Sequence, residues 1–89
     1  MQTQLLIDGQ WRDGAAGDRF DVEDPATAQV IASVAAGTTD DATDACAAAS
    51  SAQRAWAATP PRERAEVLRR CWQVLVDHAD ELARLITLE

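Results

Sequence analysis

The sequence is poor in cysteine, histidine and positive charge, and each shortage excludes a class of protein. Cys46 and Cys71 are the only two cysteines, too few for the disulfide framework of a small secreted domain. A single histidine, His78, and the lack of a Cys-x-x-Cys pair exclude a zinc site built from this chain alone. The eight cationic residues, all arginine, are scattered among 15 acidic ones, for a net charge of −7. Because phosphate affinity comes from clustered cations, we expect no nucleic-acid partner.

Long apolar runs and targeting signals are also missing. The longest uncharged stretch, residues 25–39, contains Pro and Gly and is too short to span a bilayer, so we expect no membrane partner. Residues 1–4 lack the positive and apolar regions of a signal peptide. The expected location is therefore the cytoplasm, where cysteines stay reduced. A length of 89 residues allows one small domain with a modest core and marginal stability.

Turn residues and alternating apolar residues predict strands in the first third of the chain. Asp8–Gly9 lies between two short apolar runs and predicts a hairpin, because Asp-Gly readily supplies the positive φ angles of a tight turn. Phe20 and Val22 alternate on one half-buried face of a later strand, which Asp24–Pro25 ends because proline cannot donate to a ladder. The predicted strands, within about residues 4–35, are Leu5–Ile7, Gln10–Arg12, Arg19–Glu23 and Gln29–Val34.

The remainder predicts three helices, at about residues 39–58, 61–77 and 80–89. Thr38 is the expected N-cap of the first, with Asp40 and Asp41 at the positive end of the helix dipole. Pro61 suits the first turn of the second helix. The segment is thus α+β in order, with antiparallel strands followed by three helices.

Apolar residues at helical spacing predict buried faces on these helices. Glu66 and Arg70 are expected to form an ion pair on the opposite, charged face of the second helix. The three tryptophans, Trp11, Trp56 and Trp72, are expected to anchor packing between elements. The predicted buried faces comprise Ala42, Ala45, Cys46, Ala49 and Trp56, then Ala65, Leu68, Cys71, Trp72 and Leu75, then Leu82, Leu85 and Ile86.

Few side chains are candidates for chemistry. Cys46 and Cys71 are either nucleophiles or structural core residues, and their apolar setting without a neighbouring histidine favours the core. His78 is either a general base or a surface residue at a helix end, and the absence of pocket-forming sequence favours the surface. The acidic cluster from Asp40 to Asp44 lacks the spacing of a calcium loop and predicts a charged helix start. The glycines at 9, 14, 17 and 37 form no phosphate-binding pattern.

The last predicted helix has no stop signal. Thr87, Leu88 and Glu89 include none of the Gly, Asn or Pro residues that usually end a helix. We expect either a cut within a longer protein or a junction added by a cloning vector.

The order of several short motifs resembles the amino-terminal segment of the NAD(P)-dependent aldehyde dehydrogenase superfamily. The resemblance covers nearly the whole chain, although Asp24 stands where that family usually has Asn. Within the superfamily, residues 9–14 and 57–66 look most like bacterial succinate-semialdehyde dehydrogenases. The motifs are Ile7–Trp11, Phe20, Asp24–Thr27, Val30–Ala32 with Val34, Trp56, Arg62–Arg64, Leu68–Arg70, Glu81–Ala83 and Thr87–Glu89.

The resemblance implies an α/β parent enzyme with a Rossmann-like coenzyme domain, a catalytic domain and an oligomerisation arm. In such enzymes a cysteine attacks the aldehyde, hydride passes to NAD or NADP, and a glutamate activates water to hydrolyse the thioester. The family's nucleophile lies well beyond position 89, so residues 1–89 include no catalytic and no cofactor-binding residue. They are expected to frame the amino-terminal part of the coenzyme domain, against the rest of the same polypeptide in a homo-oligomer.

One family site reaches into this segment. Some members bind a structural monovalent cation through two backbone carbonyls and a carboxylate, which match Val22, Glu23 and Glu89 here. The absence of a bound ion stays the alternative, because carbonyl ligands leave no sequence signature.

The sequence therefore leaves two functions open. The first is a fragment of an aldehyde dehydrogenase that oxidises an aldehyde, expected to be succinate semialdehyde, and that is inactive alone. The second is a self-contained acidic α+β module that binds a partner through exposed apolar helix faces and catalyses nothing.

Overall fold

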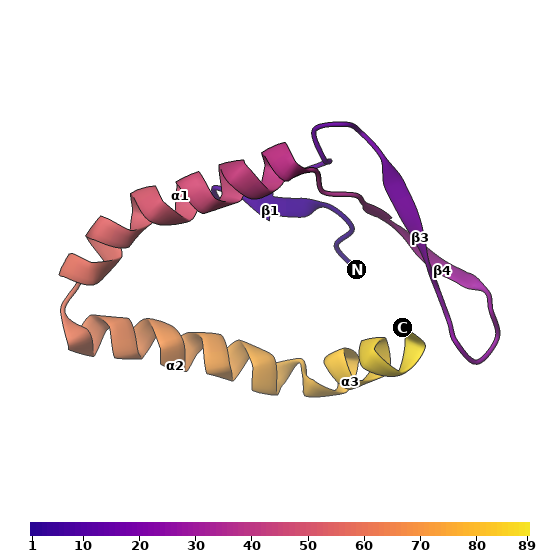
Figure 1. Ribbon diagram of the computed structural model, residues 1–89. Coiled ribbons are helices and arrows are strands. Elements are labelled where there is room, and N and C mark those ends of the chain that lie inside the picture. The colour runs from indigo at the N-terminus through magenta and orange to yellow at the C-terminus, as the bar shows by residue number, and fades with distance from the viewer.

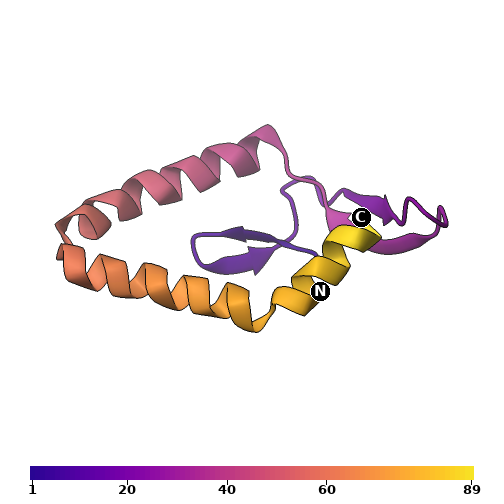
Figure 2. The ribbon, with the colours of Figure 1, turned by 90° about the horizontal axis from the view of Figure 1, so that it is seen from below.

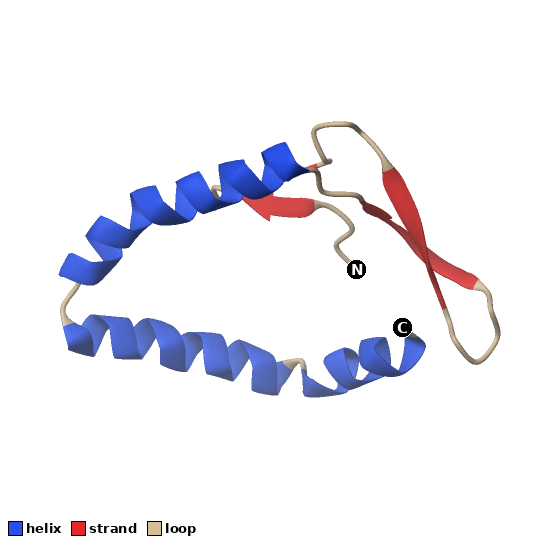
Figure 3. Cartoon of the chain, in the orientation of Figure 1, coloured by secondary structure: helices blue, strands red, loops and turns tan.

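The computed structural model describes all residues from Met1 to Glu89 as two antiparallel hairpins followed by three helices (Figures 1 and 3). This order confirms the predicted succession of strands and helices. None of the helices combines the length and the apolar character needed to cross a bilayer. The elements are β1 (Leu5–Ile7), β2 (Gln10–Arg12), β3 (Arg19–Glu23), β4 (Val30–Ala35), α1 (Thr39–Ala58), α2 (Pro61–Asp77) and α3 (Ala79–Leu88).

The first hairpin is built around the predicted Asp-Gly turn. β1 and β2 pair antiparallel with Leu6 opposite Trp11. Asp8 and Gly9 have φ angles of 51° and 73°, the left-handed conformation that a two-residue hairpin turn requires. The local sequence alone therefore determines this turn and its register.

The second hairpin pairs β3 with β4 and contains one irregularity. The register shifts between Val22 and Glu23. The turn after β3 is closed by Asp24, whose N–H donates to the Gln29 carbonyl at 2.9 Å and whose Oδ1 accepts from the Ala26 N–H at 2.8 Å. Because Gln29 takes part in this turn, β4 begins one residue later than predicted, at Val30. It also ends one residue later, at Ala35, because Ala35 pairs with Arg19.

Local signals also determine the helix boundaries. α1 starts after Thr38, and Pro61 occupies the first turn of α2, as predicted. His78 alone separates α2 from α3, so α3 begins at Ala79, one residue earlier than expected. His78 Nδ1 lies 2.9 Å from the Val74 carbonyl oxygen at the end of α2.

The helices form an open frame. α1 lies along the first hairpin, whereas α2 runs back from the linker in the opposite direction and diverges from α1 (Figures 1 and 2). In both views the end of α3 points toward the second hairpin. The radius of gyration is 16.6 Å. A compact domain of this length would have about 12 Å, so the frame does not close around a core.

The predicted burial of the helix faces is therefore wrong for this chain. Only Gly14, Ala35 and Asp41 are buried among the 89 residues. On α2, by contrast, Leu68 is 61% exposed and Trp72 56% exposed. The physical reason is that α1 contacts β1, whereas α2 contacts α3 mainly where the two helices join at His78, which leaves these faces without a covering layer.

Most of the aromatic side chains are likewise left uncovered by the rest of the chain. Trp11, Trp56 and Trp72 are all exposed, so their predicted role as anchors between elements is wrong within this chain. Val22 is half-buried as predicted, but Phe20 on the same strand is exposed.

The predicted ion pair on α2 forms with a different partner. Glu66 binds Arg69 through two hydrogen bonds, of 2.9 and 3.1 Å, and not Arg70. A guanidinium three residues away presents two nitrogens to both carboxylate oxygens, which makes this spacing the better one here.

Candidate functional site

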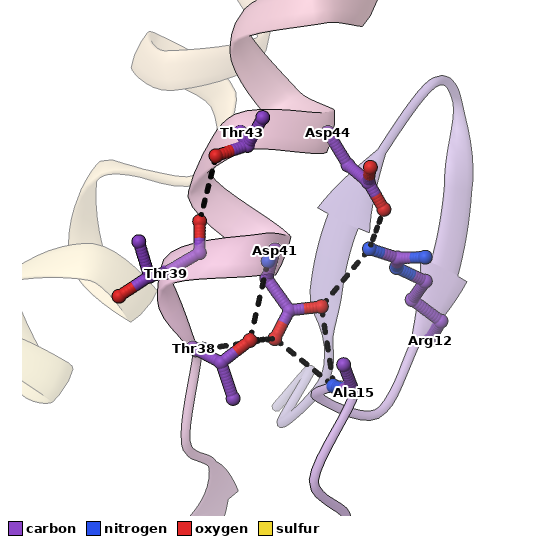
Figure 4. A network of polar contacts seen from close by, with 7 residues as sticks. All are labelled: Arg12, Ala15, Thr38, Thr39, Asp41, Thr43 and Asp44. Atoms are coloured by element: carbon purple, nitrogen blue, oxygen red, sulfur yellow. Dashed lines mark hydrogen bonds and ion pairs between the residues drawn. The ribbon is translucent and has the colours of Figure 1, made fainter.

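The most extensive polar network surrounds Asp41 in the first turn of α1 (Figure 4). Its carboxylate accepts hydrogen bonds from the Thr38 N–H at 2.8 Å and the Thr38 hydroxyl at 2.9 Å. In return, the Thr38 hydroxyl oxygen accepts from the Asp41 N–H at 3.2 Å. This reciprocal pair is a capping box, which satisfies backbone groups that a helix start would otherwise leave unpaired.

The same carboxylate ties the helix to the first hairpin. It accepts from the Ala15 N–H at 2.9 Å and from Arg12 Nη2 at 2.9 Å, and Arg12 Nη2 also lies 3.0 Å from Asp44. Arg12 is the last residue of β2, so one buried carboxylate joins β2, the following loop and α1. Sequence reasoning predicted Thr38 as the cap but missed the Thr-x-x-Asp spacing, which was the available signal for the part of Asp41 in the capping box. No local signal pointed to the contacts with Arg12 and Ala15.

Electrostatics favour the ionised form of Asp41. Hydrogen bonds from the backbone N–H groups of Thr38 and Ala15 hold its pKa below the ordinary value of 3.8, with smaller help from the Arg12 charge. Since those donors occupy the carboxylate oxygens, the acidic cluster serves as a helix cap. This confirms the interpretation of Asp40 and Asp41 as a charged helix start.

Gly14 lies where the loop after β2 passes closest to the strand that leads into α1. A Cβ at this position would collide with the Ala36 carbonyl oxygen and would lie 3.3 Å from Asp41 Oδ2. Only glycine fits there without moving the backbone, so the loop that supplies the Ala15 N–H depends on Gly14.

Two adjoining shallow grooves run between the first hairpin and α1. Each has a volume of about 360 Å³. Their walls are mostly aliphatic, and Asp41, already fully hydrogen-bonded, is the charged side chain in the groove at the start of α1. The grooves therefore offer apolar surface and no convergent catalytic groups. The residues shared by both are Leu6, Ile7 and Ala45.

The candidate nucleophiles lie on two different helices, and the candidate base lies at a helix junction. Cys46 on α1 and Cys71 on α2 are free and exposed, so the interpretation of both as core residues is wrong within this chain. His78 is exposed at the junction of α2 and α3, which confirms its interpretation as a surface residue at a helix end.

The residues matched to the family's cation site lie on two elements. Val22 and Glu23 flank the register shift in β3, and Glu89 follows the last residue of α3. No three His, Cys, Asp or Glu side chains of the chain converge into a metal cluster. A site made largely of backbone carbonyls is not tested by that finding, and it stays a prediction.

Comparison with known proteins identifies the family. The model of the aldehyde dehydrogenase family matches residues 11–89. The chain belongs to the aldehyde dehydrogenase family. The succession of hairpins and helices described above is therefore the start of an aldehyde dehydrogenase fold, as the sequence resemblance implied.

Relatives whose names state a reaction are identical to this chain at about two fifths of the aligned positions. An NADP-dependent succinate-semialdehyde dehydrogenase of Escherichia coli, GabD, is 41% identical over 99% of this chain and 18% of its own length. A malonate-semialdehyde dehydrogenase of Geobacillus kaustophilus is 45% identical over 94% of this chain and 17% of its own. The crystal structure of PnpE in complex with nicotinamide adenine dinucleotide gives a TM-score of 0.93 at 38% identity, over 99% of this chain and 18% of PnpE.

The chain thus spans less than a fifth of the length of the relatives that it matches. Its backbone nevertheless superposes closely on the matching part of PnpE. The open frame is therefore the conformation that the matching 18% of PnpE has within that longer chain.

Proposed function

We propose that these 89 residues form the amino-terminal part of the coenzyme-binding domain of an enzyme that oxidises succinate semialdehyde to succinate. The observation that supports this most strongly is the 41% identity to GabD over 99% of the chain. The nucleophilic cysteine, the glutamate base and the NAD or NADP site belong, in this proposal, to polypeptide outside these residues. Bound NAD(P)+ would accept the hydride of the aldehyde.

The role of this segment in the reaction is to frame the fold. The four glycines form none of the phosphate-binding patterns of a dinucleotide site, and Cys46 and Cys71 lie on separate helices without a paired base. We therefore expect the 89-residue chain alone to bind NAD(P)+ weakly and to oxidise no aldehyde. Assembly of the whole enzyme as a homo-oligomer in the cytoplasm, and the cation at Val22, Glu23 and Glu89, are further parts of the proposal.

The choice of aldehyde rests on the relatives alone. Succinate and malonate semialdehydes both carry a carboxylate at the end opposite the aldehyde, so the relatives' reactions point to this substrate class. No residue that would contact such a carboxylate is assigned within positions 1–89. The similarity of residues 9–14 and 57–66 to bacterial succinate-semialdehyde dehydrogenases is the reason for preferring the longer substrate.

The test is a substrate panel with the natural polypeptide that contains these residues. NADH or NADPH formation at 340 nm is followed with succinate semialdehyde, malonate semialdehyde and an unsubstituted aldehyde of similar length. We expect the highest kcat/KM with succinate semialdehyde and none with the isolated 89 residues. A preference for the unsubstituted aldehyde would contradict the substrate class, and turnover by the isolated chain would contradict the framing role.

The alternative function, a self-contained interaction module, lacks comparable support. Membership of the aldehyde dehydrogenase family accounts for the order of the elements along the chain, and three buried residues give a free-standing domain too little core.

A further inference from the structure

α2 and α3 each carry exposed apolar side chains at helical spacing, which together are called the α2–α3 stripe. Its members on α2 recur at the spacing that places side chains on one helix face, and its members on α3 are four residues apart. Ile86 is 78% exposed, Leu68 61% and Leu75 58%. The α2–α3 stripe comprises Leu68, Cys71, Trp72, Leu75, Leu82 and Ile86.

The other face of α2 is charged and needs no cover. Glu66 and Arg69 satisfy each other there, and both side chains are more than half exposed. A helix with one apolar and one charged face normally packs its apolar face against protein. An exposed apolar surface of several large side chains on a soluble protein marks an interaction site.

Two observations favour a larger protein body as the cover of the stripe, and a third argues against a second copy of this chain. The chain superposes on PnpE with a TM-score of 0.93 while covering only 18% of that chain. The radius of gyration of 16.6 Å exceeds the about 12 Å of a closed domain. A second copy is a poor occupant, because two chains of net charge −7 repel each other.

We infer that the α2–α3 stripe is a docking surface for the body of an aldehyde dehydrogenase, meaning the roughly four fifths of the relatives' length that this chain does not cover. The inference rests on the proposed function for the identity of the occupant. It assigns the contact to one face of α2 and α3, with Cys71 inside the contact and Glu66 outside it.

Cys71 provides a direct readout of this contact. In a chimera, residues 1–89 replace the matching segment of GabD, and each cysteine is labelled with iodoacetamide and followed by peptide mass spectrometry. We expect Cys71 to react about 100-fold more slowly in the chimera than in the isolated chain, because a thiol under packed side chains reacts only through local opening. Equal rates would overturn the inference.

A matched control places the thiol on the charged face of the same helix. In the variant with Cys71→Ala and Glu66→Cys, we expect similar labelling rates in the chimera and in the isolated chain. Protection at both positions would show non-specific burial of the whole helix and would contradict a docking face confined to the stripe.

The remaining outcomes separate this inference from the proposed function. A chimera with protected Cys71 and no aldehyde oxidation would support docking and count against the function. An active chimera with accessible Cys71 would overturn docking alone, as would a chimera that fails to fold when GabD itself folds. Protection of Cys71 that rises with the concentration of the isolated chain, without protection in the chimera, would overturn the inference. It would show that a second copy of the chain covers the stripe.

Discussion

Asp41 joins elements that are distant in sequence through a single buried carboxylate. It is 3% exposed and receives donors from Arg12, Ala15 and Thr38. The ionised form favours these contacts, because protonation turns one carboxylate oxygen into an O–H donor and reduces the capacity of the group to accept hydrogen bonds. The attachment of the first hairpin to α1 therefore depends on the charge of one residue.

This dependence predicts a specific response to acid. The pKa of Asp41 is lower in the folded chain than its ordinary value of 3.8, so the folded state gains stability from its ionisation at any pH above about 4. That stability is lost as the pH falls from about 4 through the folded pKa. NMR titration of the Asp41 carboxyl carbon should give a midpoint below 3.8.

Two variants test whether the charge of Asp41 contributes to the acid dependence of folding stability. Asp41→Asn should weaken the chain at neutral pH and remove this part of its acid dependence. Asp40→Asn is the matched control, because Asp40 is an exposed neighbour that makes none of the hydrogen bonds of the network. Both variants are measured in GabD that carries residues 1–89 in place of its own matching segment, because three buried residues give the isolated chain little core. Identical acid unfolding curves with and without Asp41→Asn, followed by circular dichroism, would contradict the role of Asp41.

At the scale of elements, Gly14 allows the first loop to pack against the segment before α1. Gly14→Ala should destabilise this contact by about 1–3 kcal/mol, since the added Cβ meets backbone that cannot rotate away. Hydrogen exchange of the Ala15 N–H, which donates to Asp41, should accelerate accordingly.

Gly37→Ala is the matched control for this prediction. A Cβ at Gly37 would make ordinary contact with Leu5 at 3.7 Å, and we expect a change within about 0.5 kcal/mol. If the Ala15 amide exchanges in both variants at the rate of the natural chain, the close approach at Gly14 does not contribute to stability and the prediction is wrong.

The elements themselves were largely predictable from local signals. Asp8 and Gly9, Thr38 and Pro61 determine turns and helix starts through backbone conformations that only a few residues favour. The burial of the helix faces was not predictable in this way. Periodicity shows which face of α2 is apolar, but it does not show whether the 89 residues supply a covering layer.

The Asp41 network was predictable only in part. The cap at Thr38 follows from spacing, whereas the contacts with Arg12 and Ala15 join residues 26 and more positions apart. Such contacts depend on how the hairpin lies against the helix.

At the scale of the whole molecule, the chain is an open frame whose apolar helix faces have no covering layer among its own residues. Its elements match those of the aldehyde dehydrogenase family along nearly the whole chain, yet only three of its residues are buried. These two facts agree if the frame acquires its stability and its function together, when it packs against the catalytic body.

The most direct test of this account is the activity of the GabD chimera that carries residues 1–89 in place of its own matching segment. NADPH formation with succinate semialdehyde and NADP+ is compared with that of unmodified GabD. We predict kcat/KM within about tenfold of GabD, because the segment frames the fold without contributing to the chemistry. A folded chimera with Cys71 protected but with kcat/KM lowered by about 1,000-fold or more would contradict the account.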